Sequence, residues 1–124
     1  MLGASHDRAY QDFLTLLTKF MEVTVQTQPG EETALVRQKF QGLSRYFQAE
    51  IAQLNDLNLP PEIAARWQSV QTEILREFKL LSTDILFLAS AKTNSTQQKR
   101  LKSIESRLTK LLGYCQIMLN KDSN

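Results

Sequence analysis

The longest helical pattern in the chain is IAARWQSVQTEILREFKLLSTDILFL, residues 63–88. Its apolar side chains recur every three or four residues, the spacing that places them on one face of an α-helix. They are Ile63, Trp67, Val70, Ile74, Phe78, Leu81, Ile85 and Leu88. Pro61 fits the first turn of a helix, and no proline or glycine follows it before Lys92. We therefore predict a helix over residues 61–92, about 45 Å long from the rise per residue.

Three further segments have the same periodicity. We predict helices over residues 5–26, 31–55 and 96–120. Breaks at residues 28–30, 55–60 and 93–95 separate the four predicted helices and are rich in turn-forming residues. Connections this short make successive helices antiparallel neighbours. The sequence therefore predicts one all-α domain over residues 1–124, an elongated antiparallel up-down-up-down four-helix bundle.

The composition excludes several classes of protein. Apolar residues make up 42% and charged residues 23% of the 124 residues, with four glycines and three prolines. These values are typical of a globular helical domain and not of a disordered chain or a β-sandwich. Cys115 and His6, the single residues of their types, lie near opposite ends of the sequence and show no metal-ligand spacing. We expect no disulfide, no metal and no cofactor, and a cytoplasmic protein. The longest apolar run, residues 85–89, is far shorter than the ~20 residues of a membrane span, so we expect no membrane insertion.

Charge is distributed unevenly along the chain. Residues 1–58 hold five basic and seven acidic residues, whereas residues 59–124 hold ten basic and six acidic residues. Part of this excess is a row of cations on the fourth predicted helix, Lys99, Arg100, Lys102 and Lys110, which is a candidate surface for an acidic partner. The alternative is an ordinary solvated helix face. No aromatic residue is interleaved with these cations, so binding of single-stranded nucleic acid is not favoured.

Asp84 is the most informative charged residue because it lies within LLSTDILFL, residues 80–88. A carboxylate in such an apolar stretch needs a cationic partner. We predict a structural ion pair between Asp84 and Arg100 or Arg107 on the next helix. A catalytic acid in a cleft is the alternative, but the sequence offers no base, nucleophile or metal ligand to act with it.

Glu73 and Glu77 lie one turn apart on the predicted helix 61–92. Paired carboxylates can perform acid–base chemistry or bind metal, but di-iron bundles also need histidines that this chain lacks. We therefore predict that the two glutamates form an exposed row with Arg76 and Lys79.

Two pairs of adjacent apolar residues cannot both face one core. Phe47 keeps the helical register, so Tyr46 is predicted at the edge of the core or exposed, as a candidate interface residue. Leu86 and Phe87 make the helix 61–92 apolar on more than one face, as in a central helix or one covered by a partner. A symmetric homodimer through Tyr46 and Phe87 is compatible with this pattern.

Short motifs are distributed over the third and fourth predicted helices. They are Trp67-Gln68-Ser69, Thr72-Glu73-Ile74, Leu80-Leu81, Asp84-Ile85-Leu86-Phe87-Leu88, Ala91-Lys92, Thr96, Arg100, Ile104, Arg107-Leu108, Leu111 and Tyr114-Cys115. Together they resemble the cyanobacterial heterocyst frequency control protein (PatD) family, and residues 40–54 agree in general character. Lys92 stands where the family pattern has arginine, which keeps the charge but weakens bidentate pairing.

The resemblance implies a small non-enzymatic regulator that binds the cell-division tubulin homologue FtsZ. Proteins similar to this one are linked to how often cells of a filament become heterocysts. FtsZ surfaces are generally acidic, so the row of Lys99, Arg100, Lys102 and Lys110 is the expected contact. The alternatives are a basic helical nucleic-acid-binding module, which would bind DNA with a steep salt dependence, or a dimeric adaptor.

Overall fold

The computed structural model describes residues 2–30 and 33–119. Over these residues the chain forms four α-helices and one π-helical turn, with no strand. They are α1 (Ala4–Gln26), α2 (Ala34–Tyr46), the π-helical turn η1 (Phe47–Ile51), α3 (Pro61–Ser90) and α4 (Asn94–Leu119). The predicted all-α class is confirmed, and the predicted bounds of the first, third and fourth helices are within two residues of those observed.

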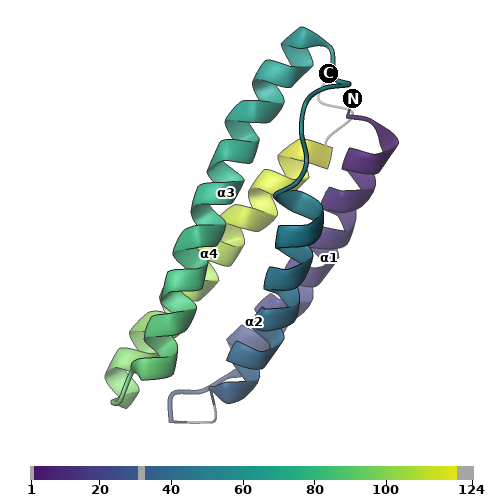
Figure 1. Cartoon of the computed structure of the whole chain (residues 1–124). Helices are drawn as coiled ribbons and strands as arrows, with labels where there is room; N and C mark the ends of the chain where they lie inside the picture. Colours follow the sequence, from purple (N-terminus) through teal and green to yellow (C-terminus); the bar gives the residue numbers. More distant parts are fainter. Residues whose placement is uncertain (1, 31–32, 120–124) are drawn as a thin grey trace.

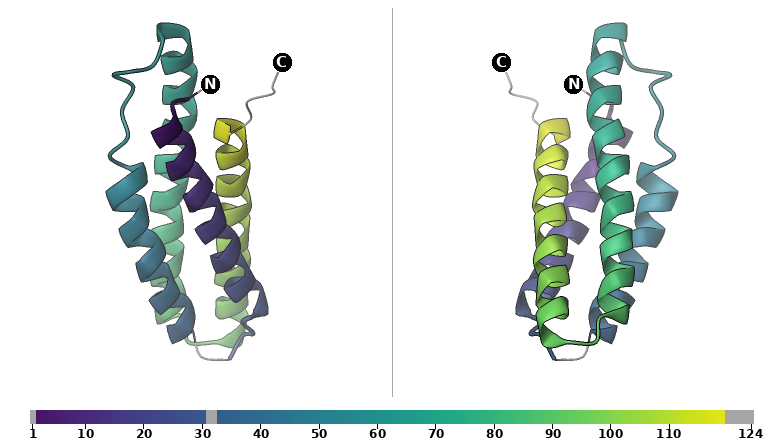
Figure 2. Two further views of the ribbon diagram at one scale, coloured as in Figure 1. Left: turned by 90° about the vertical axis from the view of Figure 1, so that its right-hand side faces the viewer. Right: turned by 90° about the vertical axis from the view of Figure 1, so that its left-hand side faces the viewer.

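The four helices run alternately up and down as a bundle (Figures 1 and 2). Each helix is flanked by the two that neighbour it around the ring: α4 packs closely against both α1 and α3, and α2 packs against α1. Of the four pairs of neighbouring helices, α2 and α3 have the backbones that approach each other least. This arrangement is the predicted antiparallel four-helix bundle, in which the α2–α3 side depends on long side chains to close it.

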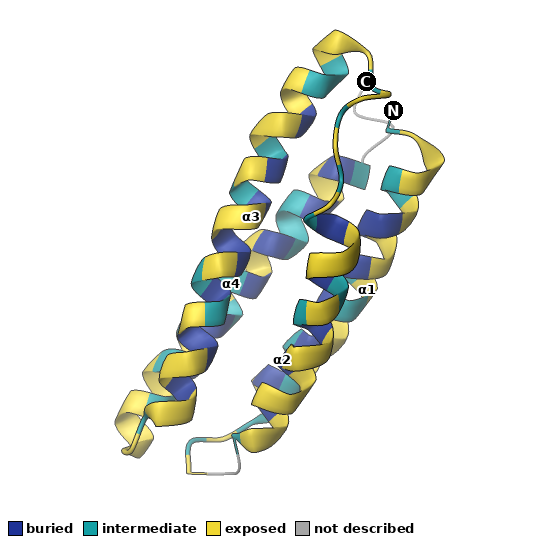
Figure 3. Ribbon diagram, viewed as in Figure 1, coloured by how far each residue is buried: buried dark blue, intermediate teal, exposed yellow. Residues whose placement is uncertain are grey.

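Aromatic side chains fill that side of the core. Phe78 of α3 lies flat against Phe47 of η1, with ring centroids 3.9 Å apart and planes at 9°. Phe40 of α2 stacks on the same ring at 5.5 Å, and Phe13 of α1 packs at 6.2 Å. Offset and tilted ring pairs of this kind add to the free energy of apolar burial. Phe78 therefore joins α3 to three other elements, within the buried stripe that lines the inside of every helix (Figure 3).

The second helix differs from the prediction of one helix over residues 31–55. Residues 31 and 32 lie outside the described residues, α2 begins at Ala34, and the helical chain widens to a π-helical turn that ends at Ile51. Leu43, Phe47 and Ile51 follow at two successive spacings of four, which rotate a regular helix by about 80° away from the core. The π-helical turn holds more residues per turn, and it keeps Ile51 fully buried.

The connections are fixed by specific hydrogen bonds. Thr93 precedes α4 and its Oγ1 accepts a hydrogen bond from the Thr96 backbone N–H at 3.1 Å, which satisfies one free donor of the first turn. Gly30 has a positive φ of 89°, a conformation that favours glycine. Its N–H donates to Gln97 Oε1 at 2.8 Å. The α1–α2 connection is thereby tied to the start of α4.

Candidate functional site

Asp84 lies on the side of α3 that faces α4, where the structure brings it together with both predicted arginines. Its Oδ2 is 3.5 Å from Arg107 Nε, and its Oδ1 is 3.7 Å from Arg100 Nη1. Ser103 Oγ donates a hydrogen bond of 2.6 Å to Oδ2. Asp84 is buried, so these partners replace the water that a carboxylate would otherwise bind. The predicted structural ion pair is confirmed and involves both arginines.

Glu77 corrects the predicted exposed row, because it is only 1% exposed. Its Oε1 accepts a hydrogen bond from Arg107 Nη1 at 3.3 Å, and its Oε2 lies 3.5 Å from Arg76 Nη2 and 3.9 Å from Lys110 Nζ. The physical reason is its register: Glu77 lies three residues after Ile74 and four before Leu81, on the buried side of α3. In the sequence, the spacing of Glu77 from Ile74 and Leu81 was the indication that it is buried.

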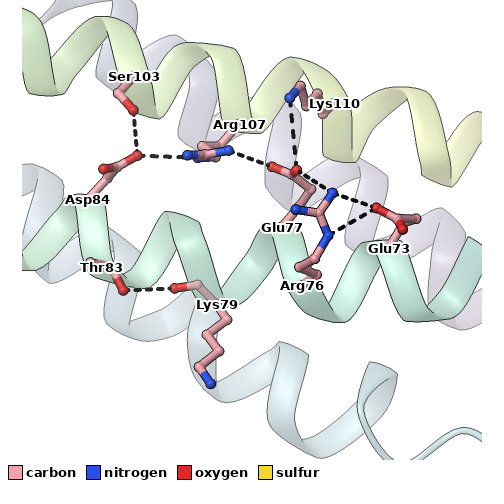
Figure 4. Close-up of polar contacts among 9 residues, drawn as sticks. All are labelled: Glu73, Arg76, Glu77, Lys79, Thr83, Asp84, Ser103, Arg107 and Lys110. Carbon is pink, nitrogen blue, oxygen red and sulfur yellow. Dashed lines mark hydrogen bonds and ion pairs between the residues drawn. The ribbon is translucent and has the colours of Figure 1, made fainter.

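The two buried carboxylates share one guanidinium. Arg107 of α4 lies between Glu77 and Asp84, two turns apart on α3, and Figure 4 shows its side chain extended along that row. We call Glu77, Asp84, Arg100 and Arg107 the α3–α4 charge cluster. The cations offset the charge of the carboxylates within the protein and join α3 to α4. It does not present a free acid–base pair to a substrate.

The rest of the predicted row is exposed, but its members differ. Glu73 is 40% exposed and pairs with Arg76 at 2.7 Å, three residues along the helix. Lys79 is exposed, and Figure 4 shows its side chain directed away from the charge cluster. A surface pair within one helix contributes only a few tenths of a kcal/mol. The predicted exposure is therefore correct for Glu73, Arg76 and Lys79 and wrong for Glu77.

The structure divides the predicted basic row on α4. Arg100 and Lys110 each lie within 4.0 Å of a buried carboxylate, whereas Lys99 and Lys102 are exposed. Among the described residues, no carboxylate lies within ion-pair distance of Lys99 or Lys102. Two of the four cations thus belong to the protein's own charge balance, and the other two face solvent with uncompensated charge.

An exposed aromatic side chain accompanies these cations at the end of α3. Phe87 is 46% exposed, and the guanidinium carbon of Arg100 lies 4.5 Å from the centre of its ring. This distance is that of a cation–π contact. We call Phe87 and Arg100, together with the exposed Lys99 and Lys102 of the same turn of α4, the aromatic–cationic patch. Arg100 lies on the side of α4 toward α3, whereas Lys99 and Lys102 lie about 100° and 160° further around the helix, on its outer side. The patch lies where α3 ends and α4 begins, so two packed helices hold its side chains.

Tyr46 is half-buried at the edge of the core, one of the two positions predicted for it. Its hydroxyl donates a hydrogen bond to the Ala9 carbonyl oxygen at 2.9 Å, and its ring stacks against Phe13 at 6.4 Å. Burial raises the pKa of the Tyr46 hydroxyl to about 12. Phe47 is buried as predicted. Tyr46 therefore contributes to the α1–α2 contact, with part of its side chain at the surface.

A buried polar network joins three elements that sequence reasoning treated separately. Trp67 Nε1 donates to the Tyr10 hydroxyl at 2.8 Å, and that hydroxyl donates to Gln71 Oε1 at 2.6 Å. Gln71 Nε2 in turn donates to the Ile51 carbonyl oxygen at 3.0 Å, at the end of η1. Burial raises the pKa of Tyr10 above its usual range. The network gives these buried polar groups hydrogen-bond partners. In the sequence, the position of Gln71 three residues before Ile74 was the indication that Gln71 is buried.

The single cysteine and histidine are engaged in the fold. Cys115 is buried in the core, and burial raises the pKa of its thiol to about 12, which opposes formation of the reactive thiolate. His6 Nε2 donates to the Asn55 carbonyl oxygen at 2.8 Å, and its ring packs edge-on against Trp67. Within residues 2–30 and 33–119, no group of three or more histidine, cysteine or acidic side chains is placed to hold a metal ion.

The fold and these surfaces define an antiparallel helical bundle whose buried charges pair internally. No helix in the described part of the chain combines the length and apolarity needed to cross a membrane. Comparison with known proteins found no matching family model, curated protein or solved structure.

Proposed function

We propose that the protein is a non-enzymatic cytoplasmic regulator that binds FtsZ and modulates its assembly. Two lines of reasoning support this proposal. The resemblance of residues 67–119 to the PatD family supplies the partner and the link to cell division and heterocyst frequency. The aromatic–cationic patch supplies a surface suited to an acidic protein partner.

The observation that carries the proposal is the contact of the exposed Phe87 with Arg100, at the end of the bundle where Lys99 and Lys102 are exposed on the outer side of α4. Aromatic and arginine side chains are enriched at protein interfaces and account for much of their binding energy. Uncompensated lysines around such an anchor steer an acidic partner and increase the association rate. The patch therefore combines Phe87 and Arg100 as an anchor with two lysines as steering charges. These residues lie on α3 and α4, the two helices that the charge cluster joins.

Binding of this kind acts on FtsZ through mass action. A protein that binds polymer more tightly than monomer shifts the assembly equilibrium toward polymer, and one that prefers monomer shifts it back. Because neither effect requires bond chemistry, the internal pairing of the buried acids agrees with a binding role.

The test is cosedimentation of the purified protein with FtsZ assembled in GTP. Lys99→Glu with Lys102→Glu reverses both uncompensated charges without removing a partner of Asp84 or Glu77. Arg37→Glu with Lys79→Glu is the matched control, because it changes the net charge by the same amount on exposed residues of α2 and α3. We expect the first variant and Phe87→Ala to lose most of the pelleted protein and the control to retain it.

Circular dichroism at 222 nm checks that each variant keeps its helices. Equal pelleting of both charge variants would remove the patch from the proposal. No pelleting of the unmodified protein, together with no binding to monomeric FtsZ, would refute the assigned partner.

A further inference from the structure

A separate groove runs between α1 and α2, on helices that do not contribute to the aromatic–cationic patch. It has a volume of about 350 Å³ and is lined by Leu16, Lys19, Phe20, Val23, Lys39, Gly42 and Leu43. We call it the α1–α2 groove. Its only charged lining residues are the two lysines, one on each helix. The remainder of the lining is apolar side chains and the backbone of a glycine.

Gly42 keeps the groove open on the α2 side. A Cβ built on Gly42 meets no atom within 4 Å, so the space in front of this residue is empty and not filled by a neighbouring side chain. Glycine costs about 1 kcal/mol relative to alanine inside a helix. A Cβ at this position therefore fits without contact with a neighbouring residue.

The α1 wall has the spacing of a helix-binding surface. Leu16, Phe20 and Val23 follow at i, i+4 and i+7 and span about 10 Å, or two helical turns. Leu16 and Val23 are half-buried, and Phe20, only 3% exposed, forms the floor between them. Leu35 lies one turn before Lys39 on α2 and is 47% exposed, which extends the apolar surface beyond the groove. An amphipathic helix binds in such a groove through apolar residues repeated at the same spacing.

The two lysines of the groove favour a bound helix that has acidic residues on either side of its apolar stripe. Among the described residues, neither Lys19 nor Lys39 has a carboxylate within ion-pair distance. Because one lysine lies on each helix of the groove, a bound helix with acidic residues beside its apolar stripe would find a cation on both flanks. A second copy docking by the same face would place lysines against lysines across a two-fold axis, which is unfavourable.

We propose that the α1–α2 groove binds an amphipathic helix of a partner protein, with acidic residues flanking its apolar stripe. This site is distinct from the proposed FtsZ contact in both location and residues. The bundle would then hold one partner at the end of α3 and α4 and a helical segment on the opposite helices, as an adaptor does.

The test uses a displayed library of helical peptides about four turns long. Leucine is fixed at positions spaced as i, i+4, i+7 and i+11, and the flanking positions are free to be Glu, Gln or Lys. Selection is performed on the unmodified protein after depletion on Gly42→Trp, which adds an indole to a residue that lines the groove. Gly42→Ala is the matched control, because it keeps the groove nearly open. Circular dichroism verifies that both variants are helical.

We expect enriched peptides to carry Glu at the flanks and to bind Gly42→Trp and the double variant Lys19→Glu, Lys39→Glu at least about tenfold more weakly. Exchange of the peptide's Glu residues for Lys should restore binding to the double variant. Binding should perturb the NMR amide resonance of Gly42, which is easy to assign because the chain has four glycines.

Three results would overturn the proposal. The first is no enrichment over Gly42→Trp, and the second is enrichment of neutral or basic flanks. The third is self-association of the protein that Gly42→Trp abolishes, because the occupant would then be a second copy. Peptide binding by the variant Lys99→Glu, Lys102→Glu should be unchanged, so failure of the FtsZ contact and failure of the groove are separate outcomes.

Discussion

Replacement of Glu77 by glutamine tests whether the α3–α4 charge cluster stabilises the bundle. Glu77→Gln keeps the shape of the side chain and the acceptor for Arg107, but it removes the charge. It also places an amide NH₂ or a neutral oxygen where Oε2 lies, an atom with no hydrogen-bond partner that faces Arg76 and Lys110. The variant therefore leaves three cations without their shared carboxylate.

The expected loss follows from burial and distance. At an effective dielectric constant of about 20, a charge pair at the 3.3 Å separation of Glu77 and Arg107 is worth about 5 kcal/mol before desolvation. The neutral side chain no longer carries the desolvation penalty of a buried carboxylate, which offsets part of that loss. The partly exposed cations also recover water. We expect the free energy of unfolding to fall by about 2 to 3 kcal/mol.

Urea unfolding followed by circular dichroism measures this loss. With an m-value of about 1.5 kcal/mol/M, the midpoint should fall by about 1.5 M at unchanged m. Glu73→Gln is the matched control: it removes the same charge one turn earlier on the same helix, from an exposed pair, and should change stability by about 0.5 kcal/mol or less. Equal losses in the two variants would refute the argument that burial of Glu77 makes its charge important.

Three further predictions concern the stability of the bundle. Gly42→Ala should raise the free energy of unfolding by about 0.5 to 1 kcal/mol, measured in urea, because alanine favours the helix and its Cβ meets no neighbour. Tyr10→Phe should lower it by about 2 kcal/mol and shift the fluorescence of the single tryptophan, because Trp67 Nε1 and Gln71 Oε1 lose their shared partner; unchanged stability and emission would contradict this. The raised pKa of Cys115, about 12, means that above pH 9 the unfolded chain loses this proton before the folded chain does. Stability should therefore fall as pH rises from 9, with a slope of up to about 1.4 kcal/mol per pH unit from this thiol, and urea titrations of Cys115→Ala should show a smaller slope between pH 9 and 10.

Helical periodicity was sufficient to predict the bundle because four apolar stripes with short connections allow few other arrangements. It failed at η1, where the local sequence gives no strong sign of a π-helical turn. The two successive spacings from Leu43 to Ile51 were the available signal, but similar spacings occur in α3 without such a turn. The outcome depends on where α1 and α3 place their side chains, and that is a tertiary effect.

The candidate site was predicted where a charge interrupts an apolar stretch. Asp84 stands among leucines, so its need for a partner was visible, and both proposed arginines contact it. Glu77 lies among the charged residues Glu73, Arg76 and Lys79, and these polar neighbours concealed its buried register. The sequence could not show which cations of the basic row pair with buried carboxylates, because the pairing of Arg100 and Lys110 depends on the rotation of α4 against α3. The α1–α2 groove likewise arises from the packing of two helices.

The weak approach of α2 to α3 has a consequence for the dynamics of the bundle. Helix α2 is the shortest of the four, and its side toward α3 is closed chiefly by the stack of Phe40 and Phe47 on Phe78. We therefore expect local opening of α2 and η1 to expose less apolar surface than global unfolding, so that their amide protons exchange sooner than those of α1, α3 and α4. A helix bound between α1 and α2 stabilises only the closed form, so it slows amide exchange of α2 selectively.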